Sequence, residues 1–425
     1  MKRILCGIIL ATAWCAAAFA QERSPEMEAF LKEYPQRAGF NTHAYEFIPV
    51  VDTKAPKGYK PFYISHYGRH GSRSEWGDFA FKEVVDVLTP AKADGVELTS
   101  AGDSLLNEAT YLRTQYNGMD GRLTPRGVRE HEQLARRMYN RFPAVFKKGS
   151  RQIRAVSSTT PRCIVSMNGF TMELRAIQPD LDIDLDTGEK YMAYIAKAAD
   201  RPLKERVQKA IAEKNYNALP DTTGVFRNLF RNPEAGKKYV KNNFFFHYAI
   251  YAIAKVAEAF DVNDNMFRYL PFADVYQLHE STFMNVYLCE GNSALFGDER
   301  MPLSKDLADV LIGQADAVIE GKSNRAADLT FGHDWPFIGL CCYFGLEGIS
   351  EKLTIEEAAA RWYPSYYCPF AANLQIIFYR SKKAGEPVLV KFLLNERETG
   401  IPALTPVQGP YYRWDDVKNF CNNRI

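Results

Sequence analysis

Two short segments carry side chains that together could move a phosphoryl group. Residues 69–73 read RHGSR, and His333 is followed directly by Asp334. A neutral imidazole at His70 could attack phosphorus in line and form a phosphohistidine that water later hydrolyses. Asp334, kept protonated by a nearby anionic substrate and by partial desolvation, could give its proton to the departing oxygen. These residue types indicate a nucleophile and a general acid for cleavage of a phosphate ester.

Further cationic side chains could hold the phosphate itself. Arg69 and Arg73 flank the histidine, Arg162 follows Pro161, and His333 precedes the acid. Guanidinium groups are planar, permanently charged forks that match phosphate oxygens. Pro161 is typical of a first helical turn, whose free N–H groups add partial positive charge beside Arg162. We expect these groups to stabilise the equatorial oxygens as charge redistributes in the transition state.

Three short runs of β-forming residues end just before these side chains. Residues 61–67, 152–156 and 328–332 are largely apolar and lead into loop or helix-starting residues, which is typical of buried strands. A threonine-proline pair predicts a helix from 125 to about 141. Because ligands bind at the carboxyl ends of strands in open α/β sheets, we expect the three junctions to meet in one site.

The alternation of strands and helices predicts an α/β fold with a doubly wound, mostly parallel sheet flanked by helices. We assign its core to about residues 45–177 and 326–425, with two closing strands near 374–379 and 388–394. From about 178 to 325 the pattern is mostly helical, with polar connections between helices. This stretch is interpreted as a smaller helical lobe inserted into the core, where it would shape the leaving-group side of the cleft.

The N-terminus predicts the compartment. Lys2 and Arg3 precede an apolar run that ends in small residues, a pattern typical of a secretory signal peptide over residues 1–20. We therefore expect a periplasmic or secreted protein formed by residues 21–425. The apolar run is shorter than the roughly 20 residues that a spanning helix needs, and we expect no membrane span later in the chain.

Composition excludes some partners and leaves other questions open. The chain has 53 basic and 51 acidic side chains, and loss of Lys2 and Arg3 with the leader balances them, so nucleic acid binding has no support. The cysteines beyond the leader are Cys163, Cys289, Cys341, Cys342, Cys368 and Cys421. An oxidising compartment would permit disulfides among them, in several alternative pairings. None has the spacing of a zinc site, and the oligomeric state stays open.

Five short segments occur in a characteristic order. They are RHGSR at 69–73, LTPRG at 123–127, Arg162 with Ser166, FGHD at 331–334 and PFAAN at 369–373. In this order they resemble the RHGxR, LTPxG, downstream arginine, late HD and PFAxN motifs of the histidine acid phosphatases. That family includes the phytases and the multiple inositol polyphosphate phosphatases. The resemblance covers most of the chain beyond the leader.

The resemblance implies His70 as the phosphoryl acceptor and Asp334 as the general acid, without a metal or organic cofactor. It implies that the phosphate is held by Arg69, Arg73, Arg162 and His333. Two places depart from the family's pattern, because Ser-Glu at 74–75 stands where a proline is common and Trp-Pro at 335–336 replaces more polar residues. The HD spelling also differs from the HAE form associated with inositol polyphosphate phosphatases. These departures concern the leaving group and leave the phosphate chemistry intact.

We interpret the chain as a phosphomonoesterase that acts on small organic phosphates, with phytate and other inositol phosphates as natural substrates. A phosphatase specialised for hexose 1-phosphates is the main alternative among enzymes. A non-catalytic protein that captures phosphate esters, or a phosphotransferase that passes the group to a second alcohol, would use the same cationic residues. The presence of both His70 and Asp334 favours catalysis over capture.

Overall fold

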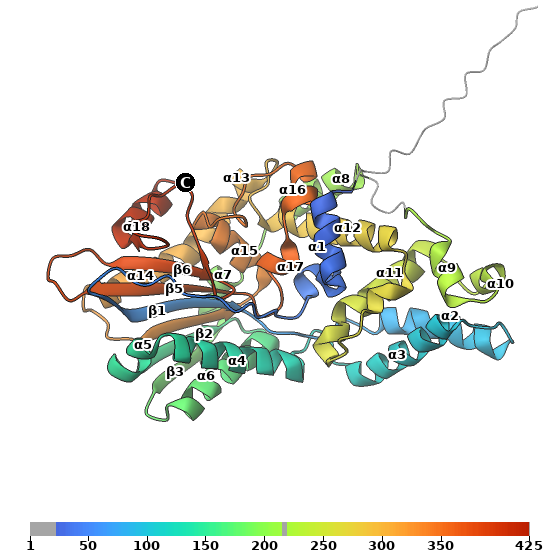
Figure 1. Ribbon diagram of the computed structural model, residues 1–425, viewed down its shortest axis with the longest axis horizontal. Coiled ribbons are helices and arrows are strands. Elements are labelled where there is room, and N and C mark those ends of the chain that lie inside the picture. Colours follow the sequence, from blue (N-terminus) through green and yellow to red (C-terminus); the bar gives the residue numbers. More distant parts are fainter. Residues whose placement is uncertain (1–22, 215–218, 425) are drawn as a thin grey trace, which may run out of the picture.

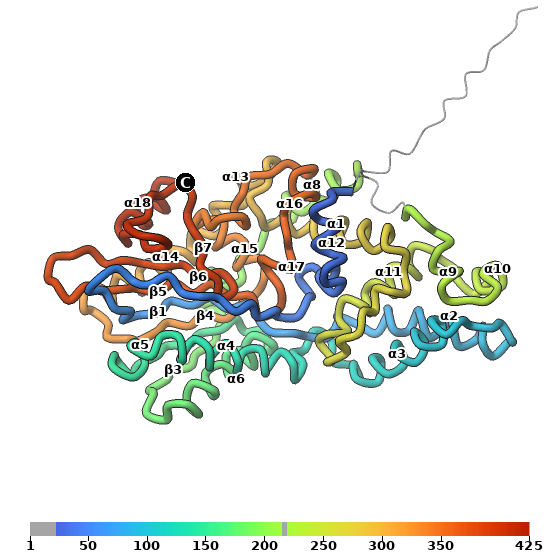
Figure 2. The backbone as a smooth tube through the Cα atoms, in the orientation of Figure 1, coloured from blue at the N-terminus to red at the C-terminus, as the bar shows by residue number. Residues whose placement is uncertain are grey.

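The computed structural model describes residues 23–214 and 219–424, so the predicted signal peptide lies outside the described residues. In the described chain one sheet runs in the order β3-β2-β4-β1-β5-β6-β7, and β8 pairs with β6. The strands are β1 (Tyr59–Arg69), β2 (Gln152–Ser157), β3 (Asp182–Thr187), β4 (Ala327–Gly332), β5 (Asn373–Ser381), β6 (Leu389–Leu394), β7 (Arg397–Thr399) and β8 (Tyr412–Arg413). Figure 2 shows β1, from the beginning of the chain, running between β4 and β5 from its end.

Strand direction changes at β1. The strands β3, β2, β4 and β1 run parallel to one another, whereas β5 is antiparallel to β1 and β6 is antiparallel to β5. The predicted α/β fold with a mostly parallel sheet is confirmed. The two predicted closing strands are β5 and β6, and they are antiparallel because only a short polar connection joins them.

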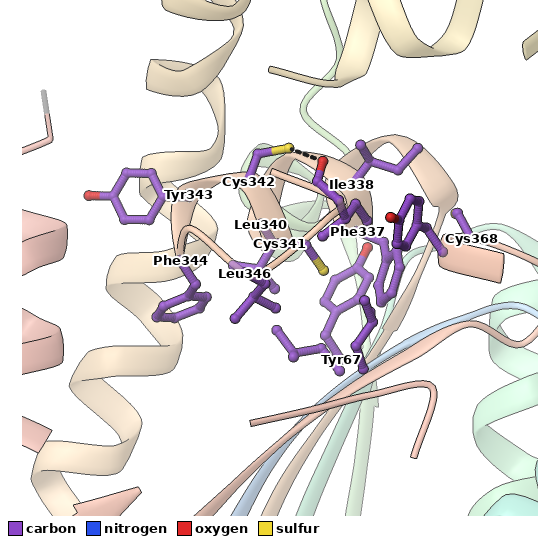
Figure 3. Close-up of a cluster of buried hydrophobic side chains, with 14 of the residues drawn as sticks. Tyr67, Phe337, Ile338, Leu340, Cys341, Cys342, Tyr343, Phe344, Leu346 and Cys368 are labelled. Carbon is purple, nitrogen blue, oxygen red and sulfur yellow. Dashed lines mark hydrogen bonds between the residues drawn. The ribbon is translucent and has the colours of Figure 1, made fainter. Parts of the chain in front are cut away.

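Helices cover both faces of the sheet (Figure 1). One face carries α4 (Pro125–Arg141), α5 (Pro143–Lys148) and α6 (Pro161–Ile177), and the other carries α14 (Lys305–Ile319), α15 (Asp334–Tyr343) and α18 (Trp414–Asn422). Successive side chains of a strand point to opposite faces, so Ile64 of β1 is buried with α4 and α6 while Tyr67 is buried with α15. Figure 3 shows Tyr67 beneath Phe337 of α15.

A second apolar core lies among helices at the far end of the molecule (Figure 1). These helices are α2 (Phe79–Ala93), α3 (Ser100–Tyr116), α9 (Gly224–Leu229), α11 (Asn243–Val256) and the first half of α12 (Phe272–Glu290). The second half of α12 reaches the core above the sheet, where Phe283 and Tyr287 are buried. The single helix α12 therefore belongs to both cores.

The boundaries of the helical lobe differ from the predicted insert at 178–325. The helices α2 and α3 come from the range assigned to the sheet core, yet α2 packs against α11, and α3 packs against α2 and α9. Conversely, β3 lies within 178–325 and pairs with β2 in the sheet. An apolar helix side predicts burial but does not show which core will cover it, and this is why the boundary could not be read from the pattern.

The remaining elements pack into these cores or join the helices and strands that form them. They are α1 (Pro25–Glu33), α7 (Glu189–Ile195), α8 (Arg201–Ala212), α10 (Pro233–Lys237), α13 (Gly297–Arg300), α16 (Ile355–Arg361), α17 (Pro364–Tyr367), and the 3-10 helices η1 (Pro35–Thr42), η2 (Ala257–Phe260), η3 (Met266–Tyr269) and η4 (Met301–Ser304). No helix in the described part of the chain has the length and apolar character needed to cross a membrane. The cysteines of the described chain, whose pairing the sequence left open, are buried free thiols.

Candidate active site

The predicted site residues follow three parallel strands that end at one edge of the sheet. His70 follows β1, Asp334 follows β4 as the first residue of α15, and Arg162 lies in the first turn of α6, just after β2. The His70 N–H donates to the Gly332 carbonyl at 3.0 Å, which joins the end of β1 to the end of β4. The three junctions therefore meet in space, as the sequence pattern predicts.

A cavity of about 260 Å³ opens among these junctions. It is lined by Arg69, His70, Arg73, Trp76, Arg162, Val286, Glu290, Asp334 and Trp335. Of the predicted site residues, only His333 does not line it, although the His333 ring centroid lies 5.8 Å from that of His70. Among residues 23–214 and 219–424, no cluster of histidine, cysteine and acidic side chains could hold a metal ion.

The loop that carries His70 is fixed by the start of α4. A Cβ atom on Gly71 would lie 2.4 Å from the Gly127 carbonyl oxygen, and a Cβ atom on Gly127 would lie 2.3 Å from the Ser72 carbonyl oxygen. Only glycine permits so close an approach of two backbones. Thr124 donates to the Ser72 carbonyl at 3.1 Å, and the Gly71 N–H donates to Ser166 at 3.1 Å. The RHGSR and LTPRG segments thus form one rigid unit.

The contacts of His70 determine which ring nitrogen can react. Nδ1 lies 3.0 Å from the Gly71 carbonyl oxygen, and because a carbonyl can only accept, Nδ1 carries the hydrogen. Nε2 therefore keeps its lone pair. Burial lowers the pKa of His70 well below 6.5, and the neighbouring charges of Arg69 and Arg162 lower it further. His70 is therefore neutral near pH 7, and its Nε2 lone pair is available to a ligand.

Asp334 is held as a carboxylate by the groups around it. Arg69 Nη2 lies 3.2 Å from Oδ2, Asn41 donates to Oδ2 at 2.6 Å, and the Trp335 N–H donates to Oδ1 at 3.1 Å. Burial alone would raise the pKa of Asp334, but the charge of Arg69 and the other nearby cations lower it overall. The acid form predicted from the sequence therefore requires the added negative charge of a substrate.

The guanidinium groups combine fixed N–H groups with unpartnered ones. Arg69 Nη1 donates to the carbonyls of Cys368 and Pro369, at 2.9 Å each, so the chain before β5 sets its position. The Nε atoms of Arg69 and Arg162 are buried and have no hydrogen-bond acceptor among the described residues. A buried donor without a partner costs about 1–3 kcal/mol. A phosphate oxygen in the cavity would supply the missing acceptor.

His333 contacts Arg162 through one ring nitrogen, and its predicted contact with phosphate stays a prediction. Arg162 Nη2 lies 3.3 Å from His333 Nδ1, and since a guanidinium can only donate, Nδ1 accepts. Nε2 then donates to Ser158 Oγ at 3.1 Å. Burial, together with the charge of Arg162, lowers the pKa of His333 to about 3. Both ring nitrogens of this neutral histidine are therefore engaged by the protein.

Comparison with family models decides the family. The model of the histidine phosphatase superfamily (branch 2) matches residues 68–395, which is well over half of the chain and includes both the RHGSR loop and the HD pair. The chain belongs to branch 2 of the histidine phosphatase superfamily. No curated protein sequence matches it.

Several solved structures share the fold of this branch 2 histidine phosphatase. The multiple inositol polyphosphate phosphatase of Bifidobacterium longum in complex with phosphate aligns with a TM-score of 0.73 at 17% identity, over 91% of this chain and 98% of that chain. The phytase of D. castellii aligns with a TM-score of 0.66 at 11% identity, over 92% and 85%. The phytase of Citrobacter braakii reaches 0.53 at 12% identity, over 86% and 98%. At these identities the likeness establishes the fold.

Some side chains at the site of this branch 2 phosphatase gave no signal in the sequence. Asn41 lies in η1, far along the chain from Asp334, which it contacts. Glu130 of α4 accepts from the Ser72 N–H at 2.8 Å and from the Ser72 hydroxyl at 2.7 Å. Its place one turn after LTPRG was the one available hint. Glu290, which also lines the cavity, ends a long helix whose pattern indicates only packing.

Proposed function

We propose that the protein hydrolyses phosphate monoesters in two steps, through a phosphohistidine on His70 Nε2. Family membership supports phosphatase activity in general. The observation that carries the specific mechanism is the juxtaposition, in one cavity, of a neutral His70 with a free Nε2 and the unpartnered Nε atoms of Arg69 and Arg162. A nucleophile without a proton and donors without acceptors suit an incoming phosphate dianion.

In the first step, Nε2 of His70 attacks phosphorus while the bond from phosphorus to the ester oxygen breaks. Arg69, Arg73 and Arg162 stabilise the charge on the equatorial oxygens. Asp334 transfers its proton to the leaving oxygen, which departs as an alcohol. In the second step, the Asp334 carboxylate takes a proton from water, the hydroxide attacks phosphorus, and phosphate leaves as the His70 lone pair is restored.

The proton on Asp334 arrives with the substrate. The pKa of Asp334 is lowered because cations, Arg69 foremost among them, outweigh the effect of burial. A bound phosphate offsets those cations, so that burial then raises the pKa of Asp334. Binding of the substrate monoanion followed by proton transfer to Asp334 gives the same reactive state.

The substrates we propose are small organic phosphates, with inositol phosphates as the favoured class. The neighbours in fold named above include an inositol polyphosphate phosphatase and two phytases, which supports this class. Hexose 1-phosphates are the second candidate, because the cavity places the two aromatic side chains of Trp76 and Trp335 beside the carboxylate of Glu290. We further propose export to the periplasm or the medium, on the predicted signal peptide at 1–20.

Replacement of the nucleophile tests the mechanism. His70→Ala should release phosphate from p-nitrophenyl phosphate at least about a thousandfold more slowly than the wild type, while inorganic phosphate still binds because the guanidinium groups remain. Calorimetry of phosphate binding by the variant serves as the control for folding. A wild type that binds phosphate but releases none from any ester would favour the capture protein. A His70→Ala variant with a normal rate would contradict the phosphohistidine.

A further inference from the structure

The leaving-group side of the cavity differs in character from the phosphate side. The cationic lining residues gather around His70, whereas the remaining lining residues are Trp76, Val286, Glu290 and Trp335. Trp76 lies over the guanidiniums of Arg73 and Arg162, with its ring centroid 4.8 Å and 4.9 Å from their central carbons. The space beyond the phosphate is therefore bounded by aromatic side chains and one carboxylate.

The second aromatic wall is rigid. The Trp335 ring stacks on His333 with centroids 4.2 Å apart and an interplanar angle of 6°, and its Nε1 donates to the Ala196 carbonyl at 3.3 Å. Flat aromatic faces beside a phosphate subsite suit a leaving group that presents a face of C–H bonds, as a six-membered ring does.

Glu290 is held in place by a buried arginine behind it. Arg300 is 2% exposed, and its Nε donates to Glu290 Oε2 at 2.7 Å. The other ends of the guanidinium donate to Ser304 Oγ at 3.2 Å and to the Trp335 carbonyl at 2.9 Å. One arginine thus fixes both the carboxylate and the backbone of the aromatic wall.

The free oxygen of Glu290 is available to a ligand. Val286 and Glu290 are four residues apart on α12, so they lie on the same side of the helix, and both line the cavity. No donor to Glu290 Oε1 is present among the described residues, and the side chain is 10% exposed. A carboxylate oxygen in this position accepts strongly from a hydroxyl group and repels an anion.

We propose that Glu290 selects the leaving group, favouring a singly phosphorylated ring polyol over the same ring carrying further phosphates. This inference rests on the proposed phosphatase function and narrows its substrate class. A ring hydroxyl donates to Glu290 Oε1 while the ring lies between the tryptophans. A second phosphate at the position of that hydroxyl would lie beside the Glu290 carboxylate, and the two negative charges would repel each other. Repulsion of the wrong ligand is a common source of specificity. Arg300 is the positioning residue for this selection.

Three substrates built on one carbocycle separate hydroxyl recognition from charge exclusion. They are myo-inositol 1-phosphate, cyclohexyl phosphate, which lacks the hydroxyls, and myo-inositol hexakisphosphate, in which phosphates replace them. At pH 7 we expect the wild type to hydrolyse the first with a kcat/KM at least about tenfold above that of either other compound, because sites that bind a substrate hydroxyl discriminate strongly against its absence.

Glu290→Gln keeps the shape of the side chain and removes its charge. The preference for myo-inositol 1-phosphate over the hexakisphosphate should fall at least about tenfold, and the preference over cyclohexyl phosphate should fall by a few fold, since a neutral acceptor bonds a hydroxyl about half as strongly. Glu299→Gln is the matched control, because Glu299 is half exposed and pairs with Arg206 outside the cavity. Its ratios should equal those of the wild type.

Two results would overturn this inference while the proposed function stands. One is a wild type that prefers the hexakisphosphate, a measurement that does not depend on whether the variant folds. The other is an equal loss with all three substrates in Glu290→Gln, which would indicate a general role in proton transfer or stability. A wild type inactive on these compounds and on p-nitrophenyl phosphate would overturn the proposed function together with the inference.

Discussion

The anchoring of the segment that holds Asp334 can be tested through His43. This residue follows η1, whose Asn41 donates to Asp334. The His43 ring is buried, with Nδ1 2.8 Å from Glu258 Oε2 and Nε2 3.6 Å from Glu46 Oε2. Its ring also packs edge-on against Tyr34 at 5.6 Å between centroids. His43→Gln removes the charge and keeps a hydrogen-bonding side chain of similar size.

The size of the effect follows from the pKa of His43. Burial alone would lower it, but the charge and hydrogen bond of Glu258, aided by Glu46, raise it from 6.5 to about 9. When the pKa of a histidine is higher in the folded state than in the unfolded state, its protonation stabilises the fold. This stabilisation is complete at pH values below the unfolded-state pKa and is lost as the pH rises through the folded-state pKa. At about 1.36 kcal/mol per pKa unit, the shift corresponds to about 3 kcal/mol, present near pH 6 and absent near pH 10.

Denaturant unfolding of the wild type and His43→Gln at pH 6, 8 and 10 measures this contribution. The difference in unfolding free energy between the two proteins should shrink by about 3 kcal/mol between pH 6 and pH 10. His279→Gln is the control, because burial lowers the pKa of His279 to about 4, so its contribution does not decline over this range. A difference for His43→Gln that stays constant with pH would refute the charged pair.

Three further predictions concern the chemistry. Asp334→Asn should lower kcat about 10²–10⁴-fold for alkyl phosphates and much less for p-nitrophenyl phosphate, and equal losses would exclude the general acid. Asp334 is a carboxylate before binding, so the proton for the leaving group comes with the substrate, and a phosphate monoester loses its last proton near pH 6. Above pH 6, the wild-type kcat/KM for alkyl phosphates should therefore fall about tenfold per pH unit. Asp334→Asn should not show this slope. Glu130→Gln should lower kcat about tenfold with little change in the affinity for phosphate, because the variant loosens Ser72 while the guanidinium groups stay in place. An unchanged kcat in steady-state assays would show that the Ser72 contacts do not position His70.

Local patterns predicted the elements that position the candidate site residues. The β1 strand, β4 and the start of α4 each have short sequence signatures, and the structure has them at Tyr59–Arg69, Ala327–Gly332 and Pro125–Arg141. Contacts between distant segments had no such signature, as for Asn41 and Asp334, which lie in η1 and α15. A role that depends on an interatomic contact is likewise invisible in the sequence.

His333 and the boundary of the helical lobe illustrate the two limits. The HD spelling places His333 at the site, but only the contact of its Nδ1 with Arg162 shows that the ring is already engaged. The helices α2 and α3 have apolar sides typical of any buried helix, and their packing into the second core is a tertiary choice. In both cases the residue types predicted that the side chains are buried, but only the structure shows which groups they contact.

Arg69 gives the proposed mechanism its means of switching Asp334 between acid and base. Its Nη1 is fixed by backbone carbonyls, so the guanidinium cannot follow the substrate, and its Nη2 contacts Asp334. Before binding, this charge stabilises the Asp334 carboxylate; when phosphate accepts from Nε, the same charge is shared and the proton affinity of Asp334 rises. After the leaving group has taken the proton, the carboxylate is again the form that Arg69 favours, ready to act as the base for water. A single immobile cation can therefore serve both half-reactions, whereas a mobile one would lose the coupling between phosphate binding and proton uptake.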